Sequence, residues 1–239
     1  MSKKKVEPVT DLRVLDVKKP KPNWISVNEN LPSAPFNLLI ISPPASGKTA
    51  LLVSMVYRFY KNVFDEIYWF SPTLKLDNTL ALNVREDETI IKVSDADELE
   101  KIDMYLREIM EAQQAKLDEG EDLDHVLVVL DDCLSFVNGN MLKRLCSVYR
   151  HLKISIIVSI QKMRMLNNTL RTCCSDVISF AIPNKKQRDV FFEEYDMFPD
   201  MEQYFETSTK EKYNWIRMDF RNMALYHGSP QGIKKIYQK

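Results

Sequence analysis

The sequence has no hydrophobic run long enough to cross a lipid bilayer. Its longest apolar runs, such as residues 126–130 and 154–160, are far shorter than the roughly 20 residues that a membrane-spanning helix needs. No apolar segment near the first residue resembles a signal peptide. We therefore expect a soluble intracellular protein without membrane insertion.

An excess of charge of one sign is also missing. The chain has 33 basic and 34 acidic residues and a formal net charge of -1, so the protein as a whole does not attract nucleic acid. Any contact with DNA must come from a local patch or from a pore built by several subunits.

A metal-binding pattern is the third absence. The 4 cysteines form no C-x-x-C spacing, and the 3 histidines are scattered. We expect no zinc site and interpret the cysteines as reduced, mostly buried residues. They are Cys133, Cys146, Cys173 and Cys174.

What the sequence contains is an alternation of strands and helices. Hydrophobic residues make up 45% of the chain, enough for a sizeable core. Residues 1–23 read as a flexible basic arm and 24–239 as a single domain. The apolar patterns predict strands at 36–41, 66–72, 89–93, 126–130, 154–160 and 177–182, with helices after 49 and at 96–117, 140–151, 185–196 and 200–206. They also predict a C-terminal β-hairpin at about 213–227. This order indicates an α/β fold with a mainly parallel sheet flanked by helices.

The segment SPPASGKT, residues 42–49, has the form of a Walker A phosphate loop between a strand and a helix. Its backbone N–H groups from Ala45, Ser46 and Gly47 onward can surround phosphate, Lys48 can reach the β- and γ-phosphates, and Thr49 can bind Mg²⁺. Ser42 stands where the first glycine is expected, and Pro43 and Pro44 lack N–H donors. The loop predicts a P-loop NTPase that uses ATP and Mg²⁺.

An aspartate pair follows the strand at 126–130, as in a Walker B motif. We expect Asp131 to orient Mg²⁺ and Asp132 to act as general base on the attacking water. The alternative is a helix-capping pair after a core strand. A GTPase is excluded, because Asp131 is not followed by the D-x-x-G pattern and residues 184–187 lack the aspartate of a guanine-reading N-K-x-D.

Two further residues suggest the type of P-loop enzyme. Gln161 ends the strand at 154–160, where it can sense the γ-phosphate, although it is also a common kind of strand-ending polar residue. Arg150 ends a helix eleven positions earlier. The segment RHLKISIIVSIQ, together with NLLIISPPASGKT and VLVVLDDC, resembles FtsK/HerA-type translocases. Among these it is most similar to the genome-packaging ATPases of large nucleocytoplasmic DNA viruses and their relatives.

The resemblance covers about residues 36–182 and implies an ASCE/RecA-like fold. It also implies a ring homo-oligomer that moves double-stranded DNA, with capsid portal or vertex proteins as partners, in the host cytoplasm or the virion. Arg150 would enter the neighbouring site as an arginine finger, with Arg164 and Arg171 as weaker candidates and a surface arginine as the alternative. Lys75, Lys143, Arg144 and Lys162 are candidates for DNA contact. Two other functions stay open: a nucleotide or small-metabolite kinase, and a non-catalytic nucleotide-binding assembly factor.

Overall fold

The computed structural model describes residues 24–73, 90–92, 98–133, 139–166 and 168–239. The basic arm predicted for residues 1–23 and the candidate DNA contact Lys75 lie outside these residues.

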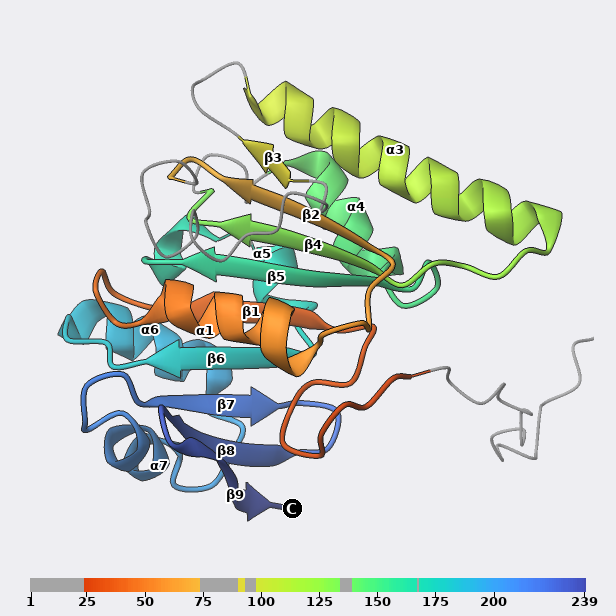
Figure 1. The fold of residues 1–239 in the computed structure, drawn as a ribbon. Coiled ribbons are helices and arrows are strands. Elements are labelled where there is room, and N and C mark those ends of the chain that lie inside the picture. Colours follow the sequence, from red (N-terminus) through yellow and green to blue (C-terminus); the bar gives the residue numbers. More distant parts are fainter. Residues whose placement is uncertain (1–23, 74–89, 93–97, 134–138, 167) are drawn as a thin grey trace, which may run out of the picture.

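Within the described chain, one sheet of nine strands runs through the molecule in the order β3-β2-β4-β5-β1-β6-β7-β8-β9 (Figure 1). The six strands from β3 to β6 pair in parallel, and β7, β8 and β9 continue the sheet antiparallel. The strands are β1 (Asn37–Ile41), β2 (Glu66–Ser71), β3 (Ile90–Lys92), β4 (Val126–Asp131), β5 (Ile154–Ile160), β6 (Asp176–Phe180), β7 (Trp215–Asp219), β8 (Ala224–Ser229) and β9 (Gly232–Gln238). The predicted α/β class, with a mainly parallel sheet, is confirmed.

The central strands lack polar alternation because both faces of the sheet are covered. Every residue of β1, β4 and β5 is buried. Along β4, Val128 and Leu130 belong to one apolar core, whereas Leu127 and Val129 belong to the other. Successive side chains of a strand point to opposite faces, so an unbroken aliphatic run supplies both cores at once.

Helices form a layer on each side of the sheet. On one face, α1 (Lys48–Ser54) continues into a π-helical turn, η1 (Met55–Phe59), and packs with residues 25–36. The other face carries most of the helices, and α4 to α6 lie behind the sheet in Figure 1. These elements are α3 (Glu98–Glu119), α4 (Asn140–Val148), the 3-10 turn η2 (Met163–Met165), α5 (Asn168–Thr172), α6 (Lys185–Tyr195) and α7 (Met201–Ser208). No helix among the described residues is long and apolar enough to span a membrane.

The C-terminal hairpin is confirmed as β7 and β8, but a third strand, β9, was not predicted. β9 pairs with β8 and forms one edge of the sheet. Its lysines, Lys234 and Lys235, are exposed, as is usual for an edge strand. No residue of β9 is fully buried, so its hydrophobic pattern is weak in the sequence.

A buried ion network fastens the N-terminal segment to these antiparallel strands. Arg217 on β7 donates to Asp176 Oδ1 through Nε (2.8 Å) and Nη2 (2.6 Å), and to Asp219 Oδ2 through Nη2 (3.1 Å). Its Nη1 donates to the carbonyl oxygen of Asn30 (2.8 Å). The side chains of Arg217 and Asp176 are each 2% exposed. Removing one of these charges would therefore leave the other buried without compensation.

Candidate active site

The loop at residues 42–49 connects β1 to α1, as predicted. Gly47 precedes the helix with φ 94° and ψ 12°, a left-handed conformation that glycine adopts without steric cost. The Ser42 N–H donates to the carbonyl oxygen of Ile160 at the end of β5 (3.0 Å). The loop is therefore anchored at the edge of the sheet where the parallel strands end.

Four of the predicted site residues meet at this edge. Lys48 Nζ lies 2.9 Å from Asp131 Oδ1 and also pairs with Asp132 Oδ2. Gln161 Nε2 donates to Asp132 Oδ2 (3.2 Å). The register explains the meeting, because Asp131 at the end of β4 lies beside Ser159 near the end of β5, and the carboxyl ends of parallel strands share one edge.

The two aspartates have different surroundings. Asp131 is 2% exposed, and its Oδ1 accepts from Ser159 Oγ (2.6 Å) as well as from Lys48. Asp132 lies in the wall of the cavity described next, with its backbone at φ 54°. Its Oδ1 is buried without a hydrogen-bond partner in the described chain. A left-handed aspartate with an unpartnered oxygen is the kind of strained polar group that occurs at functional sites.

An open cavity of about 720 Å³ lies over the loop, within the volume range of sites for small ligands. The whole segment from Ser42 to Ala50 lines it, together with Asp132 and Gln161. Thr73, Lys212 and Tyr213 complete the lining, and the sequence analysis did not find them. They carry no motif, and Lys212 and Tyr213 reach the loop only because β7, which follows them, pairs with β6.

The residues at the cavity fit a magnesium ion held jointly with nucleotide phosphates. Mg²⁺ typically binds one or two carboxylates, waters and substrate phosphates rather than a dedicated protein cage. Thr49 and Asp132 line the cavity, and Asp131 lies against Lys48 beside it. Across the described residues, no group of three or more histidines, cysteines or acidic residues could hold a metal by itself.

The neighbouring thiol is not a candidate nucleophile. Burial, and then the nearby carboxylates of Asp131 and Asp132, raise the pKa of Cys133 well above its ordinary value. Its Sγ donates to the carbonyl oxygen of Phe70 (3.2 Å). All four cysteines are free thiols in the structure.

Arg150 is not part of this cluster. It follows α4 and precedes β5, so it lies at the opposite edge of the sheet from Gln161. It is exposed, and its Cζ lies 5.6 Å from the centre of the Tyr149 ring. Arg171 is bound within its own subunit to Glu194 (3.1 Å), whereas Arg164 is exposed.

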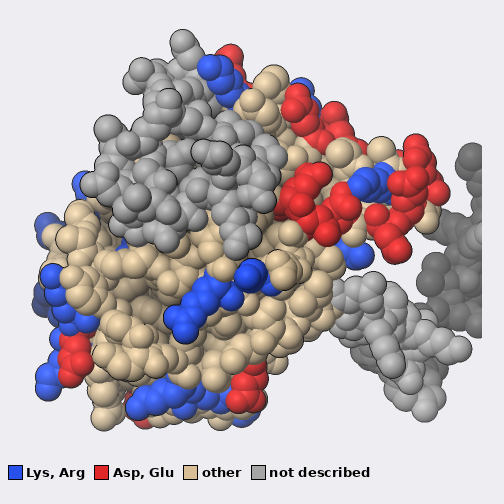
Figure 2. Space-filling model, viewed as in Figure 1, with Lys and Arg blue, Asp and Glu red and all other residues tan. Residues whose placement is uncertain are grey.

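The candidate DNA contacts are distributed over different elements. Lys143 and Arg144 lie on α4, and Lys162 is exposed directly after Gln161. Figure 2 shows acidic side chains gathered over the end of α3 and the turn that follows it. The exposed acidic residues there are Asp118, Glu119, Glu121 and Asp122. This end of the molecule repels a phosphate backbone.

Comparison with known proteins agrees with the sequence resemblance. A family model described as "Poxvirus A32 protein" matches residues 26–218. No curated protein sequence matches significantly.

Among solved structures, B204, the DNA-packaging ATPase from Sulfolobus Turreted Icosahedral Virus, is similar over 82% of this chain and 98% of its own (15% identity, TM-score 0.61). The genome packaging NTPase B204 from Sulfolobus turreted icosahedral virus 2, in complex with ATP-gammaS, is similar over 82% and 97% (12% identity, TM-score 0.58). EssC (ATPases 2 and 3) from Geobacillus thermodenitrificans is similar over 84% of this chain and 39% of its own (15% identity, TM-score 0.55). At these identities the structural likeness shows a shared fold.

Proposed function

The chain belongs to the poxvirus A32 protein family, and from this premise we propose that it is a magnesium-dependent ATPase that packages a viral genome by moving double-stranded DNA. The B204 proteins of the same fold are a DNA-packaging ATPase and a genome packaging NTPase, and the proposal extends that activity to this chain. The observation that carries it is the meeting of Lys48, both aspartates and Gln161 beside the phosphate loop.

Lys48 forms ion pairs with both carboxylates at the end of β4. When ATP enters the cavity, its β- and γ-phosphates compete for the same ammonium group. The departure of Lys48 leaves Asp132 with its negative charge directed at the cavity. The Lys48 ammonium group can thus pair either with the aspartates or with the phosphates. Binding of the phosphates would therefore free Asp132, the proposed base, from its ion pair with Lys48.

Each acidic residue then has a separate role. Asp132 accepts the proton of the attacking water, while Gln161 holds its Oδ2 in place. Asp131, which accepts a hydrogen bond from Ser159, would hold Mg²⁺ together with the Thr49 hydroxyl. The ion would supply positive charge against the phosphates. The shorter reach of aspartate than of the more usual glutamate requires the water to lie closer to β4.

We propose that a second copy of the chain supplies further positive charge, which stabilises the negative charge of the transition state. Arg150 cannot serve its own site, because the length of β5 separates it from Gln161. In a ring, the edge of the sheet that carries Arg150 would face the neighbouring subunit's phosphate loop. An arginine supplied in this way raises the hydrolysis rate by about 10³–10⁵.

The experiment that tests the proposal is phosphate release from Mg·ATP with and without double-stranded DNA, measured beside particle mass in solution. We expect an oligomer whose hydrolysis is stimulated by DNA, and Lys48→Ala should abolish turnover. Lys61→Ala is the matched control, because Lys61 is exposed after η1 and lines no part of the cavity. A kinase would instead turn over as a monomer only with a phosphate acceptor, and an assembly factor would bind ATP without hydrolysis. Either result would reject the proposal.

A further inference from the structure

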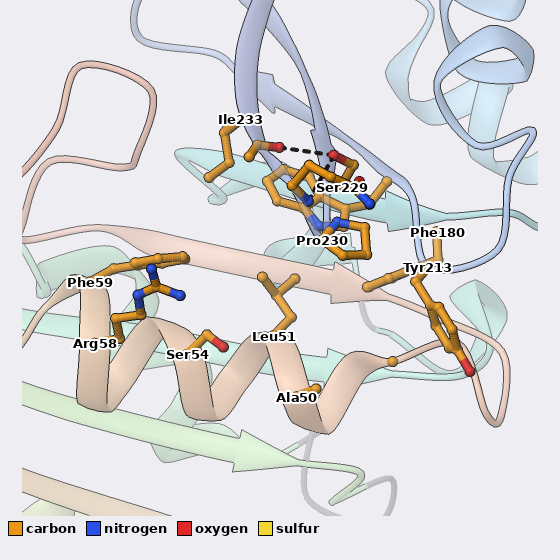
Figure 3. A pocket seen from close by; sticks show the side chains of 14 residues that line it. Ala50, Leu51, Ser54, Arg58, Phe59, Phe180, Tyr213, Ser229, Pro230 and Ile233 are labelled. Atoms are coloured by element: carbon orange, nitrogen blue, oxygen red, sulfur yellow. Dashed lines mark hydrogen bonds between the residues drawn. The ribbon is translucent and has the colours of Figure 1, made fainter.

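A second cavity, of about 590 Å³, adjoins the first. It lies between the outward face of α1 and the turn that joins β8 to β9. Figure 3 shows Leu51 and Ser54 on the helix directed toward Pro230 and Ile233 of the C-terminal strands. Both cavities share Gly47, Ala50 and Tyr213 as lining residues, so the two spaces meet at the phosphate loop.

Tyr213 stands at this junction. Its ring lies against the loop so closely that a Cβ atom built on Gly47 would be 2.9 Å from Tyr213 Cδ1. Tyr213 is still 45% exposed, so part of it is accessible to a ligand. Lys212 Nζ, on the phosphate side, lies 4.8 Å from the ring centre. One dipeptide therefore presents a cation to the first cavity and an aromatic ring to both.

The walls of the second cavity are mostly apolar. Its large side chains are Leu51, Phe59, Phe180, Trp215, Pro230 and Ile233. The hydroxyl of Ser229 is engaged within the turn, since it accepts from the Gln231 N–H (3.3 Å) and donates to the carbonyl oxygen of Gly232 (3.4 Å). The lining contains no carboxylate and no histidine, and its other polar side chains are Ser54, Gln231 and Arg58, whose Cζ lies 5.8 Å from the centre of the Phe59 ring. The apolar side chains make this a space for a flat ring system.

The strand order indicates whether the phosphates or the nucleoside of a bound nucleotide would lie in this cavity. Asp132 and Gln161 follow β4 and β5, on one side of β1, whereas Tyr213 precedes β7, beyond β6 on the other side. The γ-phosphate must face the two catalytic groups. The nucleoside must then leave the loop on the side of Tyr213 and the second cavity.

We propose that the cavity between α1 and the β8–β9 turn holds the purine base and the ribose of the nucleotide, with Tyr213 as the stacking surface. This inference rests on the proposed function, because it assigns the nucleoside half of the same ATP. The large apolar and aromatic side chains of the lining would hold the nucleoside mainly by its shape and by stacking.

The test compares two ligands that differ only in the part at issue: ATPγS and inorganic tripolyphosphate, each with Mg²⁺. Their dissociation constants are measured by calorimetry on the full chain. Tyr213→Ala should weaken ATPγS about tenfold, the scale of a base–aromatic stack, and change tripolyphosphate by less than about twofold. Tyr213→Phe keeps the ring and should bind both ligands as the wild type does.

A second variant changes a residue of α1 that lines the same cavity. Ser54→Phe narrows the cavity from α1, and it too should weaken ATPγS while sparing tripolyphosphate. Thermal melts check that each variant folds. If both variants bind ATPγS normally, or if Tyr213→Ala weakens both ligands equally, the base is not in this cavity. If Lys48→Ala leaves both ligands bound normally, the phosphate loop is not the nucleotide site, and the proposed function fails together with this inference.

Discussion

The Arg150→Ala variant tests whether the active site is shared between two subunits or is completed by one subunit alone. β5 has seven residues, and at about 3.3 Å per residue it holds Arg150 more than about 20 Å from Gln161. The side chain is exposed and lies over the Tyr149 ring. The variant should therefore fold and bind ATP as the wild type does. Its turnover should fall about 10³-fold if the neighbouring site loses its arginine.

Mixing Arg150→Ala with Lys48→Ala subunits makes the prediction quantitative. An interface is complete when the loop comes from the first variant and the arginine from the second. With equal amounts and random order in a ring, about a quarter of the interfaces are complete. If the sites act independently, phosphate release should recover to about a quarter of the wild-type rate. Native mass measurements must show mixed rings. Mixed rings whose rate equals the sum of the separate variants would refute the assignment of Arg150.

Three further predictions concern single residues. Asp132→Asn should keep ATP affinity within about twofold but lower phosphate release by about 10²–10⁴-fold, because an amide cannot accept the proton of water. If Asp131→Asn is the milder of the two, the metal and base assignments are reversed. Arg217→Met removes the cation between two buried carboxylates and should lower the free energy of unfolding in urea by about 3–5 kcal/mol. Arg188→Ala, whose partner lies 4.0 Å away at the surface, should cost less than about 1 kcal/mol, and equal losses would contradict the account of the network. Burial raises the pKa of Cys133, so a thiol reagent at about pH 8 should modify it only after unfolding, and fast modification of the folded protein would show that the strand end is open.

The sequence predicted the part of the fold that depends on local pattern. Aliphatic runs identified β1, β4 and β5, because strands buried on both faces carry no polar alternation. The P-loop spacing and the acidic pair at the end of β4 then predicted which side chains meet. Parallel strands place their carboxyl ends at one edge, so Lys48, Asp132 and Gln161 could be associated without coordinates.

The remainder depends on contacts between distant segments. β9 is an edge strand with exposed lysines and only partial burial, so its pattern differs little from that of a surface loop. Lys212 and Tyr213 carry no motif, and their place beside Gly47 follows from the antiparallel pairing of β7 with β6. The partners of Lys48 could be predicted from the motifs, but the aromatic wall beside the loop could not.

Movement along DNA is the central claim, and displacement of a third strand tests it most directly. A duplex carries a fluorescent triplex-forming oligonucleotide, and release of the label is followed after addition of the protein and Mg·ATP. A translocase should release the label in a reaction that requires hydrolysis, so Lys48→Ala and ATPγS should give none, while Lys61→Ala should behave as the wild type does. Continued ATP hydrolysis on the same DNA with the third strand left in place would contradict translocation.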